Sequence, residues 1–111
     1  MIRPFPKKSE KIYKAYCAKF SPCKSRTDIT SPVGTAHAYD LVHILKRAIS
    51  KAGTINRSAV RDALETVGQH NGLVRSYDPV FTRNRHDALD VSDFRMARYG
   101  KNGAIVPLKS K

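Results

Sequence analysis

The spacing of apolar residues predicts three helices in the first two thirds of the chain. Ser9 can cap a first helix with a body from Lys11 to Phe20, and Pro22 stops it because proline lacks an amide donor. One face of this helix carries apolar or long side chains at spacings of three and four residues: Ile12, Ala15, Tyr16 and Lys19. Residues 21–31 are polar and read as an exposed loop.

The second predicted helix spans residues 32–52. Ser31 followed by Pro32 is typical of an N-cap and a first helical position, and Gly53 supplies a C-terminal stop. A continuous apolar stripe with helical period lies between them, at Ala38, Leu41, Val42, Leu45, Ala48, Ile49 and Ala52. We expect this stripe to be the buried face. Val33, Tyr39 and Ile44 fall outside it, so the helix has more apolar surface than one stripe can bury.

The third predicted helix runs over residues 57–67. Asn56 is its N-cap and Gly68 ends it. Its inward positions are Ala59, Val60, Ala63, Leu64 and Val67.

The pattern changes after Gly72. Residues 73–77 form a short extended run that Asp78 and Pro79 halt, and residues 82–92 are polar and irregular. Residues 94–99 alternate as a strand does, with Phe94, Met96 and Arg98 on one face. A turn at 100–103 and a second strand at 104–108 complete a C-terminal β-hairpin. The predicted fold class is therefore α+β, with three helices followed by a short strand and a hairpin.

The net charge of +12 is the clearest feature of the composition. Residues 1–31 carry +6, residues 32–72 carry +2 and residues 73–111 carry +4, with no block of consecutive lysines or arginines. A generally basic surface explains this distribution better than a nucleic-acid-binding arm, which is usually denser. At 111 residues the chain has room for one small domain. No apolar run approaches membrane-helix length, and residues 1–8 lack the apolar core of a signal peptide, so the chain as written would stay in the cytoplasm.

Two cysteines, Cys17 and Cys23, have a C-x5-C spacing that fits no common metal or redox motif. Two free thiols and one disulfide are both compatible with it. A disulfide would close a seven-residue loop, which the chain-entropy model values at roughly 2.4 kcal/mol.

A metal site on the second helix is the first chemistry to weigh. His37, Asp40 and His43 lie at i, i+3 and i+6, and three such groups can hold a metal with one position open. The i, i+6 spacing spreads the two imidazoles too far for them to converge well. We therefore read a polar helix face, with Asp40 hydrogen-bonded to a neighbouring histidine or a backbone donor, and expect no metal and no cofactor.

Catalytic chemistry has little support. His70 lies near a turn, and the His86-Asp87 pair in a polar loop is a weak indication of a general base. The sequence has no nucleophile motif and no Gly-rich phosphate loop. We assign no catalytic residue and expect the protein not to be an enzyme.

Cations and aromatic residues alternate in the last third of the chain. The set is Arg75, Tyr77, Arg83, Arg85, Arg95, Arg98, Tyr99 and Lys101. Platforms that stack single-stranded nucleic acid have this composition, but the RNA-recognition consensus is absent and aromatic residues on strands are more often core. A small basic nucleic-acid-binding protein is thus the alternative function.

Several segments resemble, in order and spacing, the C-terminal part of periplasmic solute-binding proteins of the branched-chain amino acid ABC transporter type. The matching segments are residues 13–20 (YKAYCAKF), 36–42 (AHAYDLV), 48–53 (AISKAG), 60–65 (VRDALE), Asn71-Gly72 before a strand, 86–89 (HDAL) and 101–107 (KNGAIVP). Together they extend over about 95 residues, which is most of this chain and about the last third of a typical family member.

The resemblance implies a part of a two-lobed α/β binding protein. It implies that residues 7–77 belong to the first lobe, that residues 82–90 form a hinge-like crossover, and that residues 91–108 form a hairpin of the second lobe. It also implies a periplasmic location, a membrane permease as partner and a small amino-acid-like ligand. No residue here matches a family ligand contact, so the ligand-binding residues stay unknown. Because few strands are available to cover the helices, we expect a homo-oligomer or exchange of the hairpin between copies.

Overall fold

The structure, a computed structural model, describes residues 7–109. It divides into two compact units. One is the continuous segment Val33–Asp90, and the other combines the chain before Val33 with the chain after Asp90.

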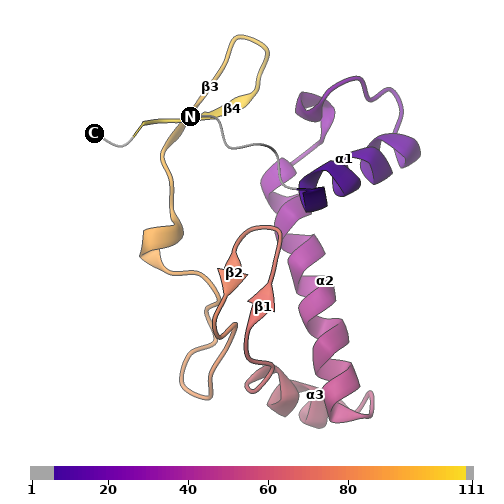
Figure 1. Ribbon diagram of the computed structural model, residues 1–111, viewed down its shortest axis with the longest axis vertical. Helices are drawn as coiled ribbons and strands as arrows, with labels where there is room; N and C mark the ends of the chain where they lie inside the picture. Colours follow the sequence, from indigo (N-terminus) through magenta and orange to yellow (C-terminus); the bar gives the residue numbers. More distant parts are fainter. Residues whose placement is uncertain (1–6, 110–111) are drawn as a thin grey trace. The chain divides into compact units, whose positions relative to one another are not determined.

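The first helix, α1, spans Lys7–Lys19 and is followed by a loop with a short 3₁₀ helix, η1, at Arg26–Asp28 (Figure 1). The predicted helix is confirmed, but it begins four residues earlier than its predicted body. Ser9 therefore lies inside the first turn and is not the N-cap. No residue of α1 is buried, so its apolar face packs only partly.

The second helix, α2, spans Pro32–Ala52, with both ends where the sequence predicts them. Gly53 takes a positive φ of 68°, and its amide donates to the carbonyl of Ile49, which ends the helix.

The predicted buried face of α2 is wrong except at Ala48, which belongs to the predicted stripe and is buried. The buried residues are Asp40, Ile44 and Ala48, whereas Leu41, Val42 and Leu45 are 54%, 65% and 44% exposed. At 100° per residue, the buried row lies roughly 100° around the helix from the centre of the predicted stripe. The cause is Asp40, which turns inward to meet backbone amides, so that Ile44 and Ala48 follow it one and two turns later. The apolar stripe is left largely outward.

The third helix, α3, spans Arg57–Leu64, three residues shorter than predicted. The side chain of Asn56 accepts a hydrogen bond from the amide of Ala59, which confirms the N-cap. The chain leaves the helix through a turn, and Val67 is buried beyond its end.

Two short strands follow α3 and lie beside α2 (Figure 1). They are β1, His70–Asn71, and β2, Ser76–Tyr77, paired antiparallel with His70 opposite Tyr77. The predicted strand over residues 73–77 is thus mostly a turn, because the amides of Leu73 and Val74 donate to a side chain and not to a neighbouring strand. The core of this unit consists of Ile44, Val67, Tyr77 and Val80, with Leu64, Phe81, Ala88 and Leu89 packed against it.

The C-terminal hairpin is confirmed, but its strands are shorter than the predicted 94–99 and 104–108. A 3₁₀ helix, η2, at Val91–Asp93 precedes β3, Ala97–Tyr99, which pairs antiparallel with β4, Ile105–Pro107. The turn at 100–103 needs Gly103 because φ there is 79°. The fold over residues 7–109 is therefore small and α+β, as the sequence predicts. It has three α-helices and two antiparallel hairpins, where the sequence predicts one short strand and one hairpin.

Candidate functional site

A buried carboxylate organises the unit Val33–Asp90. The side chain of Asp40 is 1% exposed, and its Oδ1 accepts the amide of Leu73 at 2.6 Å. Its Oδ2 accepts the amide of Val74 at 2.8 Å and the hydroxyl of Tyr77 at 3.3 Å. We call Asp40, Gly72, Leu73, Val74 and Tyr77 the Asp40 cluster. It joins the middle of α2 to the β1–β2 hairpin, more than thirty residues away in sequence.

Gly72 lets the hairpin approach the carboxylate this closely. A Cβ atom at position 72 would lie 2.6 Å from Oδ2 of Asp40 and 2.8 Å from the carbonyl oxygen of Arg75. Since real Cβ atoms essentially never come so close to other heavy atoms, any side chain there would push the turn away from α2. Within the Asp40 cluster, the carboxylate on α2 and the glycine on the turn therefore depend on each other.

The candidate metal ligands do not come together. Asp40 accepts hydrogen bonds from two backbone amides and from the hydroxyl of Tyr77. Of the two partners expected from the sequence, a neighbouring histidine or a backbone donor, the structure shows the backbone donor. Nδ1 of His43 lies 3.0 Å from the carbonyl oxygen of Tyr39, and the rings of these two residues are in contact, tilted by 32° with centroids 4.3 Å apart. Within residues 7–109, no three His, Cys, Asp or Glu side chains are grouped so as to hold a metal ion.

Two cations of α2 donate hydrogen bonds to the carbonyl groups that follow α3. Arg47 donates to the carbonyl oxygens of Gln69 at 2.6 Å and Val67 at 3.0 Å, and Lys51 donates to that of Thr66 at 2.6 Å. Positive charge at the C-terminal end of a helix also interacts favourably with the negative pole of the helix dipole. His70 lies in the same group, with Nδ1 3.1 Å from Arg47. It is thus part of a structural network.

The second histidine candidate, His86, contacts a carboxylate from α3. Nε2 of His86 and the guanidinium of Arg61 each lie 3.0 Å from Oε1 of Glu65. These three residues line a pocket of about 170 Å³ together with Leu64 and Phe81. The pocket is smaller than the roughly 300 Å³ at which ordinary ligand pockets begin. Asp87 supplies only its backbone carbonyl, to Arg85, so the sequence-predicted His86-Asp87 pair is not assembled.

A shallow apolar groove lies between α2 and α3. It has a volume of about 290 Å³ and is lined mainly by apolar side chains, Leu45, Ile49, Ile55, Val60 and Leu64, together with Arg57 and Arg61. Apart from the two arginines, the described residues of its lining have no charged or polar side chain to meet the charged ends of an amino acid. An apolar partner surface fits its chemistry better.

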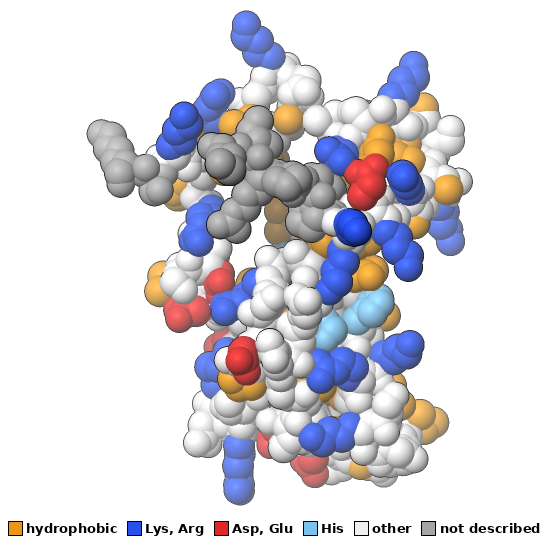
Figure 2. Space-filling model, viewed as in Figure 1, with side chains coloured by type: hydrophobic (Ala, Val, Ile, Leu, Met, Phe, Trp, Pro, Cys, Tyr) orange, Lys and Arg blue, Asp and Glu red, His pale blue; other side chains and the backbone are white. Residues whose placement is uncertain are grey.

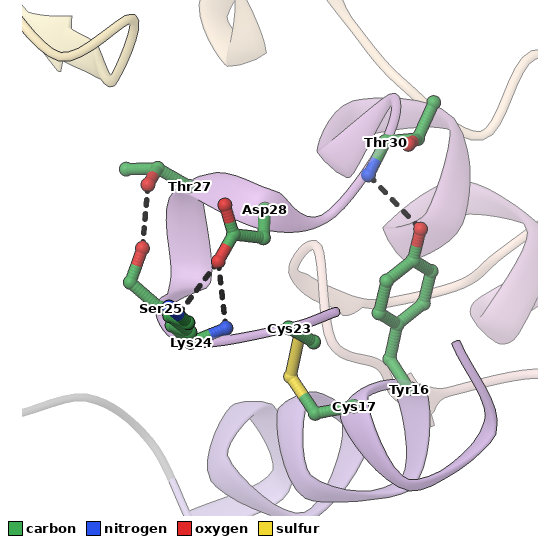
Figure 3. Close-up of a disulfide and its surroundings, with 8 residues drawn as sticks. All are labelled: Tyr16, Cys17, Cys23, Lys24, Ser25, Thr27, Asp28 and Thr30. Atoms are coloured by element: carbon green, nitrogen blue, oxygen red, sulfur yellow. Dashed lines mark hydrogen bonds between the residues drawn. A yellow bond between two sulfur atoms is a disulfide. The ribbon is translucent and has the colours of Figure 1, made fainter. Parts of the chain in front are cut away.

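In the other unit, Cys17 and Cys23 form a disulfide, which settles the alternative that the spacing leaves open (Figure 3). The loop after it is fixed by Asp28, whose carboxylate accepts the amides of Lys24 at 2.7 Å and Ser25 at 2.9 Å. These two hydrogen bonds lower the pKa of Asp28 because they favour its charged form.

Tyr16 ties α1 to the end of the same loop. Its hydroxyl accepts the amide of Thr30 at 3.1 Å (Figure 3). Hydrogen bonds from Thr30 lower the pKa of the Tyr16 phenol below its ordinary value.

The interleaved cations and aromatic residues separate into two groups. Tyr77 is buried in the core, and Arg85 donates to the carbonyl oxygens of Pro79 at 2.7 Å and Val80 at 3.3 Å. Arg98, Tyr99 and Lys101 lie exposed on the C-terminal hairpin. Figure 2 shows the lysines and arginines spread over the visible face and not gathered in one patch, as a generally basic surface requires.

Comparison with known proteins gives no match to a family model, to a curated protein or to a solved structure. None of the helices within residues 7–109 has the length and apolarity to cross a membrane.

Proposed function

We propose that this chain is the C-terminal part of an extracellular solute-binding protein that serves uptake of an amino-acid-like small molecule through an ABC transporter. The Asp40 cluster carries the proposal. It joins two of the segments on which the resemblance rests, Tyr39-Asp40 and Asn71-Gly72.

The cluster gives these segments a physical reason to occur together. An aspartate that points from a helix into the protein core needs hydrogen-bond donors there. A turn that supplies two backbone amides to this carboxylate needs a glycine so that its backbone can come close. Each segment alone is a weak match. Two segments that depend on each other for packing and hydrogen bonding are less easily matched by chance. Their joint occurrence supports a shared ancestry with that family.

The proposed role is binding and not catalysis. By the resemblance, the ligand is a small amino acid or amide, the partner is a membrane permease and the compartment is the periplasm. We assign no residue of this chain to the ligand. The groove between α2 and α3 is mainly apolar, and the pocket lined by Glu65 and His86 is small. The chain alone should therefore bind small amino acids or amides poorly.

Self-association belongs to the same proposal. Leu41, Val42 and Leu45 leave an apolar strip on α2 that a folded α/β lobe would cover with a sheet. In the isolated chain, we propose that a second copy covers it.

The test is calorimetric titration of two chains with a panel of small amino acids and amides. One chain is the 111-residue protein, and the other is extended upstream of Met1 as far as the reading frame continues. We expect the extended chain to bind one ligand class and the 111-residue chain to show no saturable binding up to millimolar ligand. Micromolar binding by the 111-residue chain would show that its site is complete. A frame that does not continue, or an extended chain that binds nothing in the panel, contradicts the family assignment.

A further inference from the structure

The C-terminal hairpin exposes an unusual amount of aromatic and apolar surface. Phe94, Met96 and Tyr99 are 75%, 76% and 79% exposed, and Ile105 and Leu108 are about half exposed. The ladder is short, with three paired residues on each strand and one more hydrogen bond from the amide of Leu108 to the carbonyl of Met96. A two-stranded ribbon of this size is only marginally stable without a partner.

The charge of this segment has one sign. From Phe94 to the end of the sequence there is no aspartate or glutamate, whereas Arg95, Arg98, Lys101, Lys109 and Lys111 are all cationic. Arg98 and Lys101 flank Tyr99 closely in sequence, and all three are exposed. A partner that matches this surface must be anionic and must offer flat apolar faces.

We propose that the hairpin 94–108 binds single-stranded nucleic acid. Phosphates would lie along the cations of β3 and the turn, and bases would stack on Tyr99. Stacking on exposed aromatic side chains together with phosphate contacts is how single strands are held without sequence preference. This inference depends on the hairpin alone and stands or falls independently of the solute-binding proposal.

Two other occupants fit less well. A second hairpin would bring like charges together across the contact. An anionic membrane surface favours a segment with one apolar and one polar face, but here apolar side chains lie on both faces. By the register and the alternation of strand residues, Tyr99 and Ile105 share one face, and Arg98 and Val106 share the other.

The test is fluorescence anisotropy of a labelled 12-nucleotide dT strand titrated with the protein at 50, 100 and 200 mM salt. We expect binding at 50 mM salt and a steep loss of affinity as salt rises, because counterions return to the phosphates. Tyr99→Ala should weaken binding by about five- to a hundredfold, the effect of losing one base–aromatic stack. Arg98→Gln should reduce the slope of log affinity against log salt by about one.

Matched controls lie outside the hairpin. Phe20→Ala removes an exposed aromatic ring at the end of α1, and Arg57→Gln removes an exposed cation of α3. Both should leave the dT affinity within twofold of the unsubstituted protein. Because Tyr99 and Arg98 are exposed, their replacement should leave the fold intact, which circular dichroism checks directly.

Three results would overturn the proposal. The first is no binding of the dT strand at 50 mM salt. The second is an equal loss of affinity in the control variants, which would mean diffuse attraction by the net charge. The third is tighter binding to phosphatidylserine vesicles than to the dT strand with the same dependence on Tyr99, which would assign the hairpin to a membrane surface.

Discussion

Replacing Asp40 by asparagine perturbs the Asp40 cluster with the smallest change in shape. In the best orientation, the asparagine oxygen takes the place of Oδ2 and keeps the donors from Val74 and Tyr77. The new NH₂ group then faces the amide of Leu73, which donates to Oδ1 in the native chain. One hydrogen bond to a charged acceptor is lost, and a part-buried amide is left without an acceptor.

The expected cost follows from these two losses. A hydrogen bond to a charged group is worth about 1.5–3 kcal/mol, and an unsatisfied buried donor costs about 1–3 kcal/mol. Since the two terms overlap, we expect Asp40→Asn to lower the free energy of unfolding by about 2–4 kcal/mol. This is a large part of the roughly 5–15 kcal/mol that holds a small domain together. Asp40→Ala removes all three hydrogen bonds and should leave Val33–Asp90 largely unfolded at 37 °C.

Urea unfolding followed by circular dichroism measures this cost. With a urea dependence of about 1–3 kcal/mol per molar, a loss of about 2–4 kcal/mol should lower the Asp40→Asn midpoint by about 1–4 M. The control is Asp62→Asn on α3, where the carboxylate is exposed and pairs with its neighbour Arg61 at the surface. A surface pair of this kind is worth at most about 1 kcal/mol. Equal midpoints for Asp40→Asn and Asp62→Asn would refute the view that the carboxylate organises this unit.

Three further predictions address the rest of the chain. Gly72→Ala should destabilise it by more than about 1 kcal/mol, because the new Cβ meets Asp40, while Gly100→Ala, whose nearest neighbour would lie at 3.4 Å, should be tolerated; equal unfolding midpoints would show that the turn can move away at no cost. Reduction of the Cys17–Cys23 disulfide should lower the free energy of unfolding by roughly 2 kcal/mol. Thermal unfolding should then have a lower midpoint in dithiothreitol, and a Cys17→Ser variant should show the same lower midpoint without reductant. The pKa of Asp28, followed by NMR titration of its carboxyl carbon, should lie below the ordinary value of 3.8; its stabilising contribution is then present above that pH and lost as pH falls through the lowered pKa, and an ordinary or raised pKa would contradict the hydrogen bonds from Lys24 and Ser25.

Local signals in the sequence were sufficient for the helices and the terminal hairpin. Ser31-Pro32 and Gly53 mark both ends of α2, and Asn56 caps α3, because caps and stops act over one turn. The turn at 100–103 is equally local. These features need no knowledge of what packs against them.

The buried face of α2 could not be read in the same way. Apolar periodicity selects the stripe with Val42 and Leu45, but the face turned inward is set by Asp40, which meets donors from residues 73–77. That contact is long in sequence, and nothing near Asp40 indicates it. The close approach of Gly72 is the signal that could have revealed it, since a glycine before a turn can mark the place where another group comes near.

Hydrogen bonds from long cationic side chains to the backbone could not be predicted from the sequence for a related reason. Nothing in the local sequence distinguishes Arg47 and Lys51 from solvated charges on a helix, yet they donate hydrogen bonds to the carbonyl groups after α3. Backbone carbonyls have no sequence signature, so their cationic partners appear only in three dimensions.

The most direct test of the proposed origin as part of a larger lobe is the mass of the chain in solution, measured by light scattering behind a sizing column at low and high salt. The outward apolar strip of Leu41, Val42 and Leu45 predicts a dimer or larger species that persists at high salt, because apolar contacts are not screened. Val42→Glu should convert it to a monomer without unfolding it, since Val42 is exposed in the single chain. A folded monomer at both salt concentrations would mean that this chain needs no further cover, and would contradict the proposal that it is one part of an incomplete lobe.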